Sequence, residues 1–200
     1  MAVLGSRSYQ ARSDRWKRIS GVCFVVAAML GMAAESVAQA IPAPEYQVKA
    51  VFLYQFTNFV EWPGDAFDDE ESPLVIGVLG EDPFGAYLDE AVRGEVVNGR
   101  ELVVQRYEST EEIGTCHILF VSSSEAPRLG RILSSMRARP LLTVGDAYSF
   151  ARSGGIIQFV TVRGRVRLRI NAEAARSADL TISSKLLSLA DIVTASAFRY

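Results

Sequence analysis

The segment from residue 45 to residue 63 carries a dense pattern of apolar and aromatic positions. One face of a helical wheel drawn on it collects Val48, Phe52, Leu53, Phe56, Phe59 and Val60. This spacing predicts a helix that packs one face against a core. Pro63 predicts its end, because proline pushes the preceding residue out of the helical conformation. Val51 and Tyr54 fall on the opposite face, so we expect a second contact there, with the same domain, a second copy or another protein.

Short apolar runs alternate with amphipathic segments beyond residue 70. The apolar runs predict strands at 73–79, 102–107, 116–122 and 141–144. The amphipathic segments predict helices at 83–92 and 127–137. Strands that alternate with helices of this length are typical of an α/β domain whose parallel strands are covered on both faces.

Two extended runs follow, at 156–162 and 165–171, and the dipeptide Arg163-Gly164 between them predicts an antiparallel hairpin. Apolar residues alternate with arginines in the second run, so one face is buried and the other is charged. The arginine row consists of Arg163, Arg165, Arg167 and Arg169. Asn171 and Ser184 predict the caps of two further helices, the second at 185–193, with a short strand at 180–182 between them.

The predicted fold is therefore α/β: a mixed, largely parallel sheet with helices on both faces and an antiparallel C-terminal hairpin. The first 40 residues do not fit this fold. They combine a basic stretch ending at Arg18, an apolar run over 19–34 and the site Ala38-Gln39-Ala40. This layout predicts a signal peptide cleaved after Ala40, a single domain over 41–200, export to the periplasm and no membrane insertion of the mature chain.

Loss of that leader removes five basic and two acidic residues and leaves 16 basic and 21 acidic ones, a net charge of −5. A mildly acidic domain of this kind gives no indication of nucleic-acid binding. Cys116 is then the only thiol, so no intramolecular disulfide can form. We interpret Cys116 as a core residue, with a redox-sensitive thiol or an intermolecular disulfide as the alternative.

No pattern in the chain predicts catalysis. Gly77, Gly80 and Gly85 lie between a strand and a helix, but their spacing matches no phosphate-binding motif and favours a plain turn. Adjacent strand residues point to opposite faces, so Cys116 and His117 cannot act as a pair. We therefore predict no enzyme, cofactor or metal site, although a hydrolase with unrecognised carboxylates is a third hypothesis. A receptor for a small ligand, bound at the carboxyl ends of the strands around 80–85, 122–124 and the segment after Gly145, is the alternative function.

Charged residues in two places need a specific interpretation. The arginine row is either a solvated strand face or a docking face for an acidic partner or an anionic ligand, because like charges on one strand repel unless they are screened. Lys49 lies within the apolar stripe of the first helix. We expect its ammonium group to reach solvent along the helix surface, and a buried ion pair across an interface is the alternative.

The order of several short motifs resembles the YfiR family of periplasmic proteins. The first helix carries Tyr46, Lys49-Ala50, Phe52-Leu53, Phe56, Phe59 and Trp62-Pro63. GVLG follows at 77–80, DPFG at 82–85, Cys116 with LFV at 119–121, LTV at 142–144, GGII at 154–157, Ile170-Asn171, SSKLL at 183–187 and Leu189-Ala190. The resemblance extends over about residues 45–193, and the order and spacing carry it rather than any one motif.

The resemblance implies a non-enzymatic periplasmic regulator. Members of the family bind the periplasmic part of a membrane-bound diguanylate cyclase and hold it inactive, which lowers cyclic di-GMP and biofilm formation, and they form dimers. Some carry disulfides, and this chain departs from them because it has Cys116 alone. The partner could equally be a sensor kinase. The residues predicted to bind the partner are Val51, Tyr54, Arg163, Arg165, Arg167 and Arg169.

Overall fold

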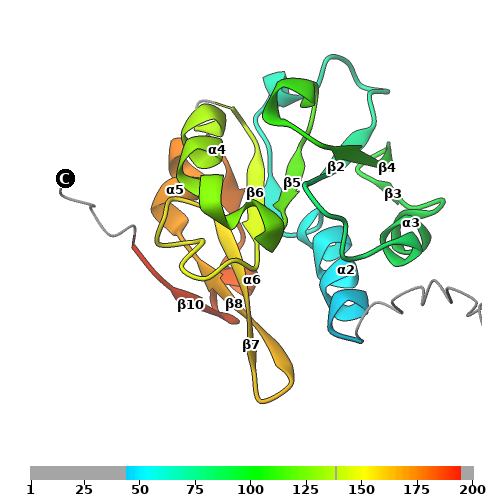
Figure 1. The fold of residues 1–200 in the computed structure, drawn as a ribbon. Helices are drawn as coiled ribbons and strands as arrows, with labels where there is room; N and C mark the ends of the chain where they lie inside the picture. Colours follow the sequence, from blue (N-terminus) through cyan, green and yellow to red (C-terminus); the bar gives the residue numbers. More distant parts are fainter. Residues whose placement is uncertain (1–43, 138, 195–200) are drawn as a thin grey trace, which may run out of the picture. The chain divides into compact units, whose positions relative to one another are not determined.

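The computed structural model describes residues 44–137 and 139–194. The predicted signal peptide over 1–40 and its cleavage after Ala40 lie outside these residues. Within them, no helix has both the length and the hydropathy that crossing a membrane requires. The helices and strands carry the labels of Figure 1.

The α-helices are α2 (Pro44–Phe56), α3 (Ala86–Val92), α4 (Leu129–Met136), α5 (Ala172–Ser177) and α6 (Ser184–Leu187). Short 3-10 helices occur at η1 (Gly64–Ala66), η2 (Thr110–Glu112) and η3 (Ser123–Arg128). The strands are β1 (Val60–Glu61), β2 (Leu74–Leu79), β3 (Val96–Val97), β4 (Arg100–Tyr107), β5 (Ile118–Val121), β6 (Leu142–Gly145), β7 (Ile157–Val162), β8 (Arg165–Ile170), β9 (Thr181–Ile182) and β10 (Ala190–Ile192).

One eight-stranded sheet organises the fold, with the strand order β10-β8-β7-β6-β5-β2-β4-β3. The neighbours from β4 through β2, β5 and β6 to β7 pair in parallel. β3 and β8 join this block in the antiparallel direction, and β10 pairs in parallel with β8. The mixed, largely parallel sheet and its antiparallel hairpin β7-β8 are therefore confirmed (Figure 1).

The sheet separates two apolar cores, because successive side chains of a strand point to opposite faces. In β2, Ile76 and Val78 belong to the core covered by α2, α3 and α6, whereas Leu79 belongs to the core covered by α4. Leu53 and Phe56 anchor α2 in the first core, and neither is exposed at all. Helices on both faces of the sheet, as the sequence predicts, are thus confirmed.

The first helix ends earlier than predicted. α2 stops at Phe56, and Thr57, Asn58 and Phe59 form a turn whose amides donate to carbonyls three residues back. The chain then pairs as β1 with β9, Val60 opposite Ile182. The prediction of a helix up to Pro63 was wrong because this long-range strand pairing overrides the local helical periodicity.

The C-terminal elements also differ from the prediction. Asn171 caps α5 as expected, since its Oδ1 accepts a hydrogen bond of 3.0 Å from the Ala174 amide. The final helix, however, is capped by Ser183 instead of Ser184 and ends at Leu187. Residues 190–192 form β10 on the open edge of β8, and pairing with that edge outweighs continuation of the helix.

A hairpin between β3 and β4 was missed, although the sequence signals it. Asn98 and Gly99 both have positive φ, 53° and 82°. A tight two-residue hairpin turn requires positive φ at both of its central residues. β3 has only two residues, too few for a period-2 pattern to reveal it.

Three parallel strands end at one edge of the sheet, and this edge positions a polar cluster. β2, β5 and β6 end at Leu79, Val121 and Gly145. β7 begins beside the end of β6, with Ile157 opposite Val144, so the β7-β8 hairpin extends beyond this edge (Figure 1). The first turns of α2 reach the same edge, where Lys49 contacts Asp146.

Candidate functional site

An apolar groove runs between α2, β8 and α6. We call it the α2 groove; its volume is about 500 Å³, and its lining includes Val48, Val51, Phe52, Phe59, Val166 and Leu189. Val48, Val51 and Leu189 keep 46%, 51% and 74% of their surface exposed. Contiguous exposed apolar surface of this kind is typical of a site for another protein or an apolar ligand.

Aromatic packing below the groove fixes the orientation of α2. The ring of Phe52 lies 6.2 Å from that of Phe56 and 6.0 Å from that of Phe159, and the rings of Phe56 and Phe159 stack at 5.9 Å. Such pairs stabilise a core beyond the burial of their area. Because these rings hold one side of α2 on the sheet, Val48 and Val51 are left on the exposed side.

Val51 and Tyr54, which the sequence places on the same face, have different environments. Val51 opens into the α2 groove. The Tyr54 hydroxyl donates a 2.7 Å hydrogen bond to Glu95 Oε2, just after α3, and this contact raises the pKa of Tyr54. The second contact expected for this face is thus made by the same domain at Tyr54, while Val51 stays available.

The arginine row is divided between the hairpin turn and one face of β8. Arg163 lies in the turn with a positive φ of 52°, followed by Gly164 at 72°. Arg165, Arg167 and Arg169 alternate along β8; the first two are exposed and Arg169 is half-buried. Among the described residues, none of the four arginines makes an ion pair within 4.0 Å. Arg167 is the member of the row that lines the α2 groove.

Lys49 forms a buried ion-pair cluster instead of reaching solvent. Its ammonium group lies 2.7 Å from Glu45 Oε1 and 2.7 Å from Asp146 Oδ2, and its side chain is 3% exposed. The Tyr46 hydroxyl donates to the same Asp146 oxygen at 2.9 Å. The expectation of a solvent-exposed ammonium was wrong, because Asp146 at the end of β6 offers a partner that only the tertiary structure brings near.

Two members of this cluster, Tyr46 and Glu45, have shifted pKa values. Burial, followed by the negative charge of Asp146, raises the pKa of Tyr46, so its hydroxyl stays a donor. The hydrogen bond from Lys49 lowers the pKa of Glu45. Breaking one partner of a buried ion pair leaves the other charge uncompensated, so this cluster ties the start of α2 to the end of β6.

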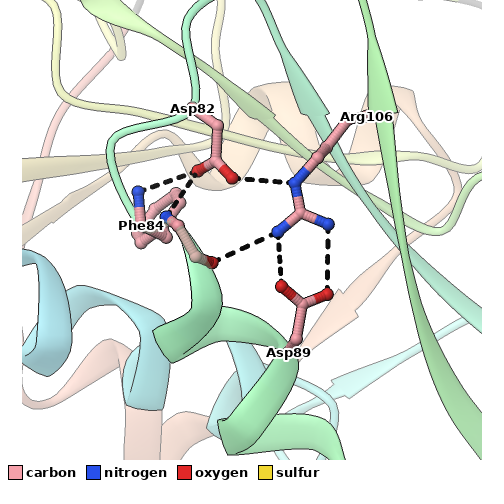
Figure 2. Close-up of polar contacts among 5 residues, drawn as sticks. Asp82, Phe84, Asp89 and Arg106 are labelled. Atoms are coloured by element: carbon pink, nitrogen blue, oxygen red, sulfur yellow. Dashed lines mark hydrogen bonds and ion pairs between the residues drawn. The ribbon is translucent and has the colours of Figure 1, made fainter. Parts of the chain in front are cut away.

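The glycine-containing loop after β2 binds a carboxylate of the protein itself. Asp82 Oδ1 accepts hydrogen bonds from the amides of Phe84 and Gly85 at 2.8 and 3.3 Å, and Arg106 Nε donates to Asp82 Oδ2 at 2.8 Å (Figure 2). Arg106 also holds Asp89 of α3 in a two-pronged contact and lowers its pKa. The amides that a phosphate would need are therefore occupied, which favours the interpretation of this loop as a turn.

The side chains of Cys116 and His117 lie in different environments. Cys116 is 7% exposed, its Sγ donates to the Ile118 carbonyl at 3.2 Å, and burial raises the pKa of its thiol to about 12. His117 Nδ1 accepts from the Val75 amide at 3.0 Å, and Nε2 lies 3.0 Å from the Ala66 carbonyl. A thiolate is the reactive form of cysteine, so this environment favours a core role for Cys116.

A comparison with protein families identifies the chain. The model of the YfiR/HmsC-like family matches residues 46–191. The chain belongs to the YfiR/HmsC-like family. This match covers α2 through the first residues of β10, so both the α2 groove and the arginine row of this YfiR/HmsC-like protein lie within the family domain.

The comparisons of this YfiR/HmsC-like protein with curated proteins and with solved structures say less than the family match. A comparison with curated proteins found no match. Solved structures similar to it include an ABC domain from Streptococcus pneumonia in complex with L-Trp, at 16% identity and a TM-score of 0.49, covering 74% of this chain and 60% of that one. A conserved domain protein from Vibrio cholerae O1 biovar El Tor shares 12% identity, with a TM-score of 0.49, over 74% of this chain and 59% of its own. The chain thus spans about three fifths of the length of these two proteins.

Proposed function

We propose that this protein is a non-enzymatic periplasmic regulator that binds the periplasmic part of a membrane-bound signalling protein and represses or tunes it. The family assignment carries the proposal. The partner is a diguanylate cyclase or a sensor kinase, and the regulated output is cyclic di-GMP and biofilm formation. Export through the leader over 1–40 brings the protein to the compartment where such a partner exposes its sensory domain.

The α2 groove and the arginine row support a protein partner. Interfaces combine an apolar centre with a polar rim, and here exposed Val48 and Val51 line the same groove as unpaired Arg167, with exposed Arg165 two residues before it on β8. The arginines would steer an acidic surface of the partner toward the groove. Tyr54, Arg163 and Arg169 remain proposed members of this surface, and Cys116 remains a proposed redox thiol only if the surrounding core opens.

A pull-down with the periplasmic domain of the partner tests this proposal. The variant R165E/R167E reverses two exposed charges on β8, and we expect it to weaken binding by at least about tenfold, the loss of about 1.4 kcal/mol. The matched control R131E/R137E makes the same charge change at two exposed arginines, one in α4 and one directly after it, and should bind normally. Equal binding by both variants would exclude the arginine row from the interface.

Cellular measurements test the regulatory part of the proposal. Deletion of the gene should raise cyclic di-GMP if the partner is a cyclase, and expression of the intact protein should lower it again. R165E/R167E should fail to restore the low level, whereas R131E/R137E should restore it. Unchanged cyclic di-GMP after deletion, together with unchanged phosphorylation of a partner kinase, would contradict the regulatory role.

A further inference from the structure

A polar pocket lies at the sheet edge where the parallel strands end. We call it the Asp146 pocket; it measures about 500 Å³, and its lining includes Tyr46, Lys49, Asp146, Tyr148, Phe159 and Arg169. α2, the segment after β6 and the β7-β8 hairpin supply these residues. Open α/β sheets bind ligands outside the carboxyl ends of their strands, so the location is favourable for a ligand.

One oxygen of Asp146 lacks a hydrogen-bond partner. Its Oδ2 accepts from Tyr46 and Lys49, whereas the buried Oδ1 has no partner among the described residues. The Asp146 side chain is only 8% exposed. An unsatisfied buried acceptor is rare in folded proteins, and a hydroxyl or amine donor on a bound molecule would satisfy it.

Arg169 is the unpaired positive charge of the same pocket. The charge of Lys49 is already matched by Glu45 and Asp146 at 2.7 Å each. Arg169, half-buried on β8 opposite Gln158, makes no ion pair within 4.0 Å among the described residues. A planar guanidinium group binds a carboxylate through two parallel hydrogen bonds.

Aromatic side chains give the pocket flat apolar surfaces. Tyr46 lines it from α2, and Tyr148 lines it with 92% of its surface exposed, whereas Phe159 lies beneath it with 2% exposed. A molecule that fits all three features has a carboxylate for Arg169, hydroxyl donors for Asp146 and a ring whose C–H face covers an aromatic side chain. We propose that the Asp146 pocket binds a small polyhydroxylated carboxylate of the sugar-acid class.

This site shares Arg169 with the proposed partner surface but does not depend on the regulatory function, and calorimetric titration of the purified protein tests it directly. The probe is glucuronate. Glucose, which lacks the carboxylate, and cyclohexanecarboxylate, which lacks the hydroxyls, are the matched controls. We expect saturable binding of glucuronate with a dissociation constant of about 1 mM or lower, and at least about tenfold weaker binding of both controls.

Variants then locate the binding. R169Q should weaken glucuronate binding at least about tenfold, whereas R165Q, on the same face of β8 but outside the pocket lining, should bind normally. D146N should also weaken binding. D146N disturbs the ion pair of Lys49, so the melting curve of this variant must be measured together with its affinity. If D146N does not fold, the affinity of R169Q, which breaks no ion pair, tests the proposal by itself.

Three results would overturn this assignment. They are the absence of saturable glucuronate binding up to about 10 mM, equal affinity for glucuronate and either control, and unchanged affinity in R169Q. Loss of the regulatory function in cells would leave the titration unaffected, so the two proposals fail separately.

Discussion

His117 shows how one buried residue joins three segments of the chain. Its two ring nitrogens contact the Val75 amide and the Ala66 carbonyl, its ring stacks on Phe67 at 4.2 Å, and its own carbonyl accepts from Trp62 Nε1 at 3.2 Å. Nδ1 accepts a hydrogen bond, so the ring is neutral and Nε2 carries the proton. Desolvation by burial therefore lowers the pKa of His117.

This lowered pKa predicts acid sensitivity. The unfolded chain binds a proton at a pKa of 6.5, whereas the folded ring resists it, so the unfolded state holds more protons as the pH falls below that value. The free energy of unfolding should be greatest above pH 6.5, decline as the pH falls from 6.5 toward the lower pKa of the folded state, and level off below that pKa. Urea denaturation at pH 5–7.5 measures this.

H117Q provides the control for that measurement. His117 is the only histidine of the chain, so the variant, although less stable overall, should show little dependence of stability on pH between 5 and 7. A pH dependence in this window that persists in H117Q would assign the effect to other groups. Cys116, the neighbouring residue, would contribute nothing here because its thiol pKa lies far above this range.

α2 is the element in which core and exposed surface are most closely interleaved. Leu53 and Phe56 are fully buried, yet Val48 and Val51 on the same helix are about half exposed. The predicted apolar stripe included Val48, which is exposed, and Lys49, which we expected to reach solvent, is buried. Periodicity identifies a helix with an apolar face, but it does not tell which apolar residues the sheet covers.

Two substitutions on α2 separate these roles. F56A should lower the free energy of unfolding by about 3–5 kcal/mol, because the Phe56 ring is fully buried against Phe159 and its loss leaves a cavity. V51A should change it by no more than about 0.5 kcal/mol, since half of Val51 is exposed. Urea denaturation of both variants checks the prediction.

The same pair of variants distinguishes core from interface. V51A should weaken capture by the partner domain while its unfolding curve stays near that of the wild type. A V51A variant that is strongly destabilised would show that Val51 contributes to the fold, and would remove it from the proposed interface.

At the scale of the whole molecule, the resemblance to the YfiR family predicts a homodimer. The α2 groove exposes Val48, Val51 and Leu189, and the edge of the sheet ends at β10. Burial of apolar surface such as this is a main source of association free energy. Either a second copy or the signalling partner could gain that free energy.

Light scattering after size-exclusion chromatography tests the dimer. We expect the purified protein to have twice the mass of one chain. V48D/V51D, which places charge on exposed positions of α2, should keep the fold. If this variant becomes a monomer, the α2 groove belongs to the second copy; if it stays a dimer and loses the partner domain, the groove belongs to the partner. A wild-type monomer at all concentrations would contradict the predicted dimer.

Local pattern determined much of this molecule from sequence alone. The alternation of apolar runs and amphipathic segments determined the α/β class, the alternation of β8 determined its charged face, and Asn171 determined the start of α5. These features depend on residues close in the chain.

The tertiary structure decided the features that depend on distant residues. α2 ends at Phe56 because the chain then pairs as β1 with β9, and residues 190–192 form a strand because they pair with the edge of β8. Lys49 is buried because it pairs with Asp146, 97 residues away in the sequence. Strand pairing and ion pairing act between segments that only folding brings together, so periodicity could not reveal them.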